Sequence, residues 1–482
     1  MNKKTNIVFL LLFTITIISN GQNEYDALLF SHFTPTLTAR YTSMGGAFSA
    51  LGADLSTIAT NPAGTGLFRK NIVNVSTSWN NQKTITQYNN ETNLVKDNSF
   101  QLSNIGFITS NLTGNLSGWK AINFGFSYNN LNNYNRSFLA TGNNYTSSLL
   151  DFHTDYLNNN PNDYENNAYY QAKIVFWDSV SSRYYNDYNY NGGNYYGSRQ
   201  SHFVETNGYA GEYNINLSSN YNDFLFLGAT IGIPHISYFN TTKHSEKAFN
   251  DTIALKDFIS YDYLDARGTG INLKLGVLLK ITQIFRVGLA FHTPTSYSFN
   301  YNYWTDVYGN IDLGEGAFST VGKSPHSNYD WNLHTPAKYI ISAATVLNKK
   351  AIISGELEYI NYSKLKLNSY NYAFENENNN IKKIYKSTFN LRLGAEFRIW
   401  LLGLRMGFFY IDSPYKSTED NKNSYKTGYS CGIGTNINGL FFDFAYSYMQ
   451  NNEQYYMYGY TDSKVNLTNK SNKFVTTLGY RF

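Results

Sequence analysis

Hydrophobic and polar residues alternate with a period of two along much of the chain. Between Phe389 and Ile399 every second residue is apolar, and the residues between them include Arg392, Glu396 and Arg398. This alternation predicts β-strands with one apolar and one polar face. About fourteen segments share the pattern. They are 71–80, 100–110, 120–131, 208–218, 224–238, 268–280, 284–299, 336–347, 351–363, 387–399, 401–411, 425–435, 439–449 and 473–482.

The links between these strands alternate in length. Short links on one side and long links on the other are typical of outer-membrane barrels, and closure leaves no unpaired backbone edge in lipid. The predicted fold class is therefore all-β, a 14-stranded antiparallel transmembrane β-barrel. The long links are 81–99, 132–207, 239–267, 300–335, 364–386, 412–424 and 450–472, and the short ones are 111–119, 219–223, 281–283, 348–350, 400 and 436–438.

Composition supports a membrane barrel. Aromatic residues make up 17% of the chain and charged residues only 15%, whereas a soluble domain carries about 25% charged residues. No apolar run after the N-terminal segment reaches the length of a membrane helix. A soluble β-sandwich also alternates, but it less often has several charges on one face and only large apolar groups on the other.

Residues 1–21 are predicted to be a secretory signal. They hold two lysines, an apolar run over 7–18, and the small residues Ser19 and Gly21 at cleavage-site spacing. Removing the two lysines lowers the net charge from +4 to about +2 (4 − 2 = 2), too little to indicate a nucleic-acid partner. Cys431 is the only cysteine, so no disulfide can form within the chain.

Residues 22–69 do not alternate, and they are rich in glycine, alanine and serine. A fourteen-stranded lumen is wider than side chains alone can fill. We therefore expect 22–69 to form a plug inside the barrel, with a disordered periplasmic tail as the alternative. Residues 70–482 then form the barrel, and 132–207 is its largest extracellular loop.

The tripeptide Asn61-Pro62-Ala63 ends this segment. It lies within residues 52–64, GADLSTIATNPAG, which resemble the hatch signature of the FadL family of outer-membrane fatty-acid and hydrocarbon transporters, the FadL and TodX type. The strand number, the plug and the C-terminal Phe482 match this family over nearly the whole mature chain. The resemblance implies passive uptake of hydrophobic molecules, long-chain fatty acids first, captured at the extracellular loops.

The family also releases its ligand sideways through the barrel wall, where the third strand kinks. Here that strand holds Asn123, Gly125 and Ser127 on one face, and Gly125 would permit a kink or a bulge. These three residues are the candidates for a lateral opening. The alternative is that Gly125 only makes room for the plug.

A carboxylated ligand needs one or two cations in an apolar cavity. The polar faces of the strands offer five candidates: Lys274, Arg286, Arg392, Arg398 and Arg405. The same faces carry Glu356, Glu358 and Glu396, so we expect many of these charges to pair with one another or with the plug.

No motif indicates an enzyme. The sequence GYSCG at 428–432 matches a nucleophile pattern, but Ser430 lies within an alternating strand without a following helix. The eight histidines show no metal-binding spacing. We expect neither a catalytic site, nor a metal, nor a cofactor.

The sequence therefore predicts a monomer in the outer membrane of a Gram-negative bacterium. The expected partners are a hydrophobic small-molecule ligand, outer-membrane lipid and lipopolysaccharide, and the barrel assembly machinery, reached through Phe482. Three alternatives remain: a surface role in protein secretion, an open diffusion porin, and uptake of haem or aromatic hydrocarbons.

Overall fold

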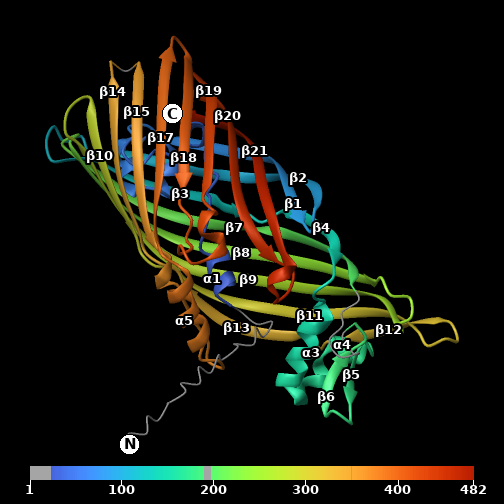
Figure 1. The fold of residues 1–482 in the computed structure, drawn as a ribbon. Coiled ribbons are helices and arrows are strands. Elements are labelled where there is room, and N and C mark those ends of the chain that lie inside the picture. Colours follow the sequence, from blue (N-terminus) through green and yellow to red (C-terminus); the bar gives the residue numbers. More distant parts are fainter. Residues whose placement is uncertain (1–22, 189–196, 349) are drawn as a thin grey trace, which may run out of the picture.

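The chain forms a closed antiparallel barrel of fourteen strands around its own N-terminal segment (Figure 1). The structure, a computed structural model, describes residues 23–188, 197–348 and 350–482. Successive barrel strands pair with one another, and pairing of the first with the last closes the sheet. The predicted fold class is confirmed. The signal predicted for residues 1–21 lies outside the described residues.

Two of the fourteen barrel strands are each interrupted once, so they carry two labels. The barrel strands are β1 (Ile72–Tyr88), β2 (Glu91–Leu112), β3 (Trp119–Asn133), β7 (Ser198–Tyr221), β8 (Leu225–Ala248), β9 (Leu255–Lys280), β10 with β11 (Phe285–His292, Ser296–Asp312), β13 with β14 (Ser327–His334, Lys338–Leu347), β15 (Ala351–Asn361), β17 (Ser387–Ile399), β18 (Leu402–Ile411), β19 (Lys426–Ile437), β20 (Leu440–Tyr456) and β21 (Lys464–Arg481).

Both interruptions fall at Thr-Pro sequences, at Pro294 and Pro336. Proline has no backbone donor, so it breaks the ladder of hydrogen bonds. Threonines bridge the two breaks: the backbone N–H of Thr335 donates to the Thr295 carbonyl at 2.9 Å. The prediction of one unbroken strand over 284–299 is therefore wrong at Pro294, because it did not take the missing backbone donor of proline into account.

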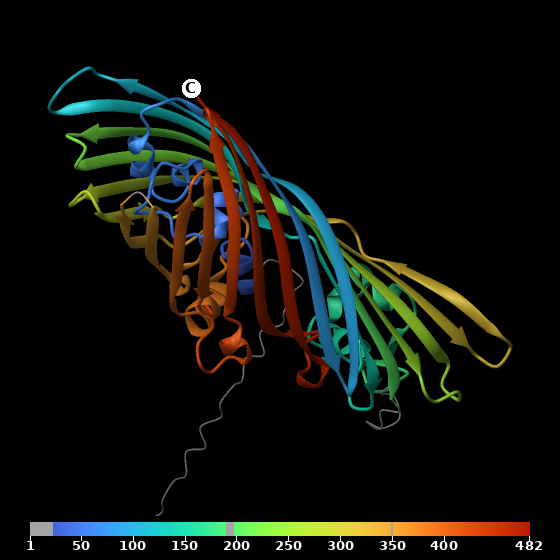
Figure 2. The ribbon, with the colours of Figure 1, turned by 90° about the horizontal axis from the view of Figure 1, so that it is seen from above.

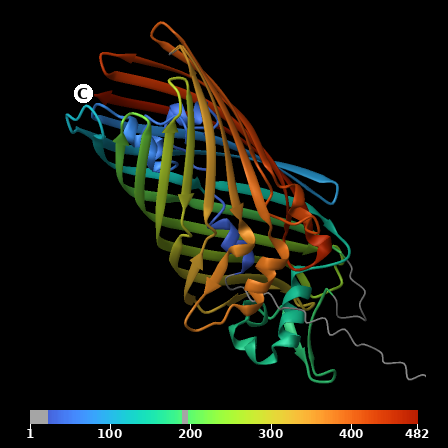
Figure 3. The ribbon, with the colours of Figure 1, turned by 90° about the vertical axis from the view of Figure 1, so that its left-hand side faces the viewer.

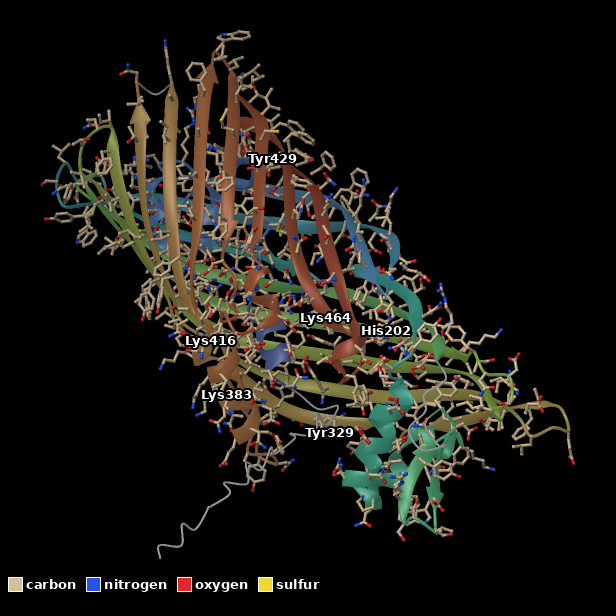
Figure 4. All side chains as sticks on the ribbon, viewed as in Figure 1. His202, Tyr329, Lys383, Lys416, Tyr429 and Lys464 are labelled. Atoms are coloured by element: carbon tan, nitrogen blue, oxygen red, sulfur yellow. The ribbon has the colours of Figure 1, made fainter. Side chains whose placement is uncertain are left out.

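Large apolar side chains cover the outer surface, whereas polar residues face the interior. Tyr429 projects from the outside of β19 (Figure 4). Asn216 on β7 and Glu356 on β15 face inward and are buried. No helix of the described residues has the length and apolar character needed to cross a membrane.

Several predicted loops are in fact strands. The link 81–99 is the end of the β1–β2 hairpin, which turns at Asn89 and Asn90, both with positive φ. The links 239–267 and 450–472 also consist largely of strand. The outer faces of these extensions are largely polar, because they continue past the apolar outer belt, and apolar residues such as Leu255, Phe258 and Val465 face inward instead. The apolar outer face by which the strands were recognised therefore disappears there. Figure 2 shows the extended strands reaching well beyond the rest of the barrel.

The long link 132–207 contains a small subdomain, beside the mouth of the barrel (Figure 3). A buried apolar cluster joins it to the barrel, in which Leu150 and Ile174 pack with Phe258 of β9. Its elements are β4 (Arg136–Asn144), which pairs with β7, α3 (Leu149–Asn159), η3 (Pro161–Asn166), α4 (Ala168–Gln171), β5 (Val175–Asp178) and β6 (Arg183–Asn186).

The remaining long links hold short elements at the same end of the barrel. They are β12 (Ala317–Lys323), η4 (Tyr362–Lys364), β16 (Lys366–Asn368), α5 (Glu375–Ile384), η5 (Asp420–Asn423) and η6 (Thr461–Ser463).

Closure of the barrel can be tested with a cross-link. Val75 of β1 faces Leu478 of β21 across the seam, and both side chains are exposed. In a Cys431→Ser background, Val75→Cys with Leu478→Cys should be joined efficiently by a short bifunctional thiol reagent, measured by intact mass. Val75→Cys with Asn466→Cys is the control, because Asn466 is also exposed but pairs with Gln87, and equal cross-linking of both pairs would contradict the register of the seam.

Candidate functional site

The N-terminal segment lies inside the barrel and contacts strands on opposite walls (Figure 2). The backbone N–H of Ala39 donates to Thr477 of β21 at 2.7 Å, and that of Ser49 donates to Glu356 of β15 at 3.0 Å. We call this segment, residues 23–69, the plug. Its elements are α1 (Glu24–Leu29), α2 (Ala39–Ser43), η1 (Leu55–Ile58) and η2 (Pro62–Leu67).

The Asn61-Pro62-Ala63 turn starts η2 and fastens it to the wall. The Asn61 side chain caps this short helix, since its Oδ1 accepts from the N–H of Ala63 at 3.2 Å. Its Nδ2 donates to the Ser49 carbonyl at 2.8 Å and to the Val277 carbonyl of β9 at 3.2 Å. Pro62 suits the first helical position, where no backbone donor is needed. One buried amide thus joins the plug to itself and to the barrel.

Glycines on adjacent strands make this close approach possible. A Cβ at Gly228 of β8 would overlap the Pro62 carbonyl, and a Cβ at Gly276 of β9 would overlap Asn61 Oδ1. Gly228 and Gly276 are cross-strand partners on the inner face. The turn and the two glycines therefore form one interface. The sequence predicted the Asn61-Pro62-Ala63 turn, but not the two glycines that receive it.

The candidates for a lateral opening line the same plug. Asn123 Nδ2 donates to the Thr65 and Phe68 carbonyls at 2.8 and 3.1 Å. A Cβ at Gly125 would lie 3.0 Å from Ile58 Cδ1. Ser127 is buried and accepts from Asn129 at 3.1 Å.

The β3 ladder is continuous at these positions. Gly125 pairs with Ile108 on one side and with Asn216 on the other. Register shifts in the β3–β7 pairing occur instead at Trp119/Ala121 and Asn130/Asn132. A lateral opening at Gly125 therefore stays a prediction, and the contact with Ile58 fits the alternative role of making room for the plug.

Four of the five predicted carboxylate contacts already hold a protein carboxylate. Arg392 donates to Glu356 at 2.9 Å and to Glu358 at 3.1 Å. Lys274 pairs with Glu212 and donates to Asn214 at 2.8 Å. The other two share Glu396, to which Arg405 donates at 2.9 Å and Arg398 at 2.8 Å, and Arg405 also pairs with Asp443. Removing one partner of such a pair leaves a costly uncompensated charge.

Arg286 differs from the other four. Its guanidinium donates to the Leu51 carbonyl of the plug at 2.7 Å. It makes no ion pair with any carboxylate in the part of the chain that the structure describes. Its position therefore ties β10 to the plug.

Three lumenal lysines were missed by the sequence analysis. Lys338, Lys426 and Lys473 occupy inward-facing positions of β14, β19 and β21, and each is half-buried. None forms an ion pair with a carboxylate among residues 23–188, 197–348 and 350–482. Lys473 donates to Thr36 of the plug at 2.5 Å.

His32 of the plug lies in the field of two of these lysines. Burial lowers the pKa of His32 well below its usual value, and the positive charges of Lys426 and Lys338 lower it further. The carboxylate of Glu358 acts in the opposite direction, but more weakly than the two lysines. The imidazole is therefore neutral at pH 7. Such a set of lysines can accept an anionic head group.

The described residues offer no metal-binding cluster. No group of three histidine, cysteine, aspartate or glutamate side chains among them is placed to hold a metal. Ser430 accepts a hydrogen bond from the N–H of Gly45 in the plug at 3.1 Å, which is a structural contact.

The glycine interface generates a prediction. Gly276→Ala should destabilise the docked plug by about 1–3 kcal/mol, because the new methyl group overpacks the Asn61 contact. Gly355→Ala on β15 is the matched control, since its Cβ would meet only Leu393 Cδ2 at 3.5 Å. We expect Gly276→Ala alone to lower the thermal midpoint and raise the ion conductance in planar bilayers. Equal behaviour of both variants would contradict the interface.

The similarity of this chain to known proteins lies in its structure. Neither protein-family models nor curated proteins match the sequence. Among solved structures, a Pseudomonas aeruginosa FadL homologue matches with a TM-score of 0.57 and 14% identity, covering 93% of this chain and 99% of that chain. The Pseudomonas putida toluene transporter TodX matches with a TM-score of 0.52 and 11% identity, covering 92% and 97%.

A TodX variant described as a monoaromatic hydrocarbon channel gives a TM-score of 0.53 at 11% identity, covering 93% and 99%. These matches extend over almost the full length of both partners, so barrel and N-terminal segment are compared together. Identities this low establish the fold alone. This chain has the fold of the FadL homologue and of the toluene transporter TodX.

Proposed function

We propose that this chain belongs to the FadL family and is a passive outer-membrane transporter for hydrophobic small molecules, long-chain fatty acids in particular. The observation that carries the proposal is the plug, fastened to the wall by Asn61 and the two glycines, inside a barrel with the fold of a FadL homologue and of TodX. A plugged lumen argues against an open diffusion porin. It suits a carrier that binds its ligand before passing it on.

The unpaired lysines favour a carboxylated ligand. Lys338, Lys426 and Lys473 form no direct ion pair with a carboxylate among the described residues, although Glu358 and Glu453 act on Lys338 and Lys426 at longer range. Their ammonium groups are therefore available to a ligand carboxylate, whereas toluene would need no cation. The plug residue His32 lies beside two of them. We propose that the carboxylate of a fatty acid binds at these lysines, in place of the five cations predicted from the sequence.

Release would then occur sideways into the membrane. The two register shifts that flank Asn123–Ser127 on β3 are the places where the wall would part from β7. In this proposal the contact of Gly125 with Ile58 links the state of the plug to the state of that strand.

A second candidate function rests on the small subdomain in link 132–207. Trp177 and Val180 of its β5–β6 hairpin are exposed. Exposed large apolar groups on a loop suit a protein partner, and a surface role in protein secretion would use them. Co-purification of a partner without fatty-acid uptake would favour this function.

Uptake of a labelled long-chain fatty acid is the first test. Cells with this protein should take up the label, and cells without it should not. Asn61→Ala with Pro62→Ala should lower uptake severalfold, because the plug loses its wall contact, whereas Asn115→Ala in an exposed turn should leave it unchanged. Equal uptake in cells with and without the protein would exclude the fatty-acid proposal.

The lysines can be tested by binding to purified protein. Lys338→Gln with Lys426→Gln should weaken palmitate binding about a hundredfold or more, since each of the two lost charged hydrogen bonds costs about 1.5–3 kcal/mol and about 1.4 kcal/mol corresponds to a factor of ten. Binding of the methyl ester, which has no charge, should change little. Lys383→Gln, on the outside of α5 (Figure 4), is the control. Equal losses for acid and ester would contradict the head-group role.

A further inference from the structure

The outer wall of the barrel contains an apolar groove of about 990 Å³. Two neighbouring rows of outward-facing residues form it, and both run across the strands. One row leads from Ile122 on β3 to Leu357 on β15, and the other leads from Leu217 on β7 to Phe389 on β17. The groove passes just beside the two proline interruptions, where the sheet bends.

Small residues line part of the groove. Ser219 and Ala229 are the small members of the two rows. Between the rows, on the inner face, lie Gly228 and Gly276 with the plug turn against them. Pairing continues without a break from Gly228 through Gly276 to Ala290. The groove therefore has no passage to the lumen, and its occupant must come from the membrane side.

One end of the groove carries positive charge. Trp119 lies at this end and packs edge-on against Tyr221, with 5.2 Å between the ring centroids. Directly beside it, Lys120 donates to Asp223 at 2.9 Å, and Arg69 pairs with the same carboxylate. Two cations share one acid, so a net positive charge remains. This end also lies at the short turns of the barrel, which face the periplasm in an outer-membrane protein.

We propose that the groove binds an anionic phospholipid of the periplasmic leaflet. Its acyl chains lie along the two apolar rows, and its phosphate contacts Arg69 and Lys120 beside Trp119. The apolar groove is continuous with the lipid-facing surface, and the charge of its end is complementary to a phosphate. The inference rests on the membrane location within the proposed function and is independent of transport.

The test uses purified protein in phosphatidylcholine nanodiscs, with a trace of phosphatidylglycerol that carries a photoreactive diazirine on one acyl chain. Mass spectrometry of the adducts should map them to β8, β9 and β10 at the groove. Ala229→Trp, and separately Ser219→Phe, should reduce this labelling severalfold. Ala395→Trp adds the same ring to the outer face of β17, away from the groove, and should leave labelling unchanged.

Folding of each variant is verified by its heat-dependent shift in electrophoresis. Unlabelled phosphatidylglycerol should compete severalfold better than phosphatidylcholine, and Lys120→Gln with Arg69→Gln should abolish that preference. Equal labelling of folded Ala229→Trp and Ala395→Trp would overturn the proposal, as would equal competition by the two lipids. Displacement by palmitate but not by phosphatidylglycerol would overturn it too, by assigning the groove to cargo. The assay involves no uptake, so its failure would leave the transport proposal standing.

Discussion

The need to pair every backbone amide and carbonyl governs this structure. In hydrocarbon an unsatisfied backbone group costs several kcal/mol, so a sheet that faces lipid has to close on itself. Pairing of β1 with β21 removes the edges. Where proline takes away a donor, threonine side chains and backbone replace the lost bonds, as at Thr293, whose hydroxyl accepts from the N–H of Leu273 at 2.9 Å. The outer apolar face and the polar interior follow from that closure.

Closure with fourteen strands creates an interior too wide for side chains to fill, and the N-terminal segment lies within it. The charges on the inner faces then lie in a confined space, which explains why Arg392 and Lys274 hold protein carboxylates. These ion pairs are part of the packing between strands. Lys338 and Lys426 form no direct ion pair with a carboxylate among the described residues, so in the proposed function they are the cations that a ligand carboxylate would reach.

The sequence predicted the lipid-facing part of the fold well, because only there do large apolar residues fill the outer face of each strand. The sequence-based prediction missed the extensions of β1 and β2. There the apolar residues Ile85 and Leu94 pair with each other but have mainly polar neighbours along their strands. The Asn61 turn could be recognised in the chain, but its partners Gly228 and Gly276 could not, since they depend on which strands meet across the lumen. The same holds for the lysines, because pairing between distant strands decides which charges are neutralised.

At Gly228 and Gly276 the plug turn on the inner side of the wall lies close to the groove on its outer side. At Gly228 and Gly276 the inner face has no side chain, and the outer neighbour Ala229 has only a methyl group. A single layer of backbone thus separates the plug turn from the membrane-side groove. Glycine weakens a strand, because it loses more backbone entropy on folding than other residues and offers no side chain for packing. The Asn61 turn supplies that packing from the inside, and a hydrocarbon chain in the groove would supply it from the outside.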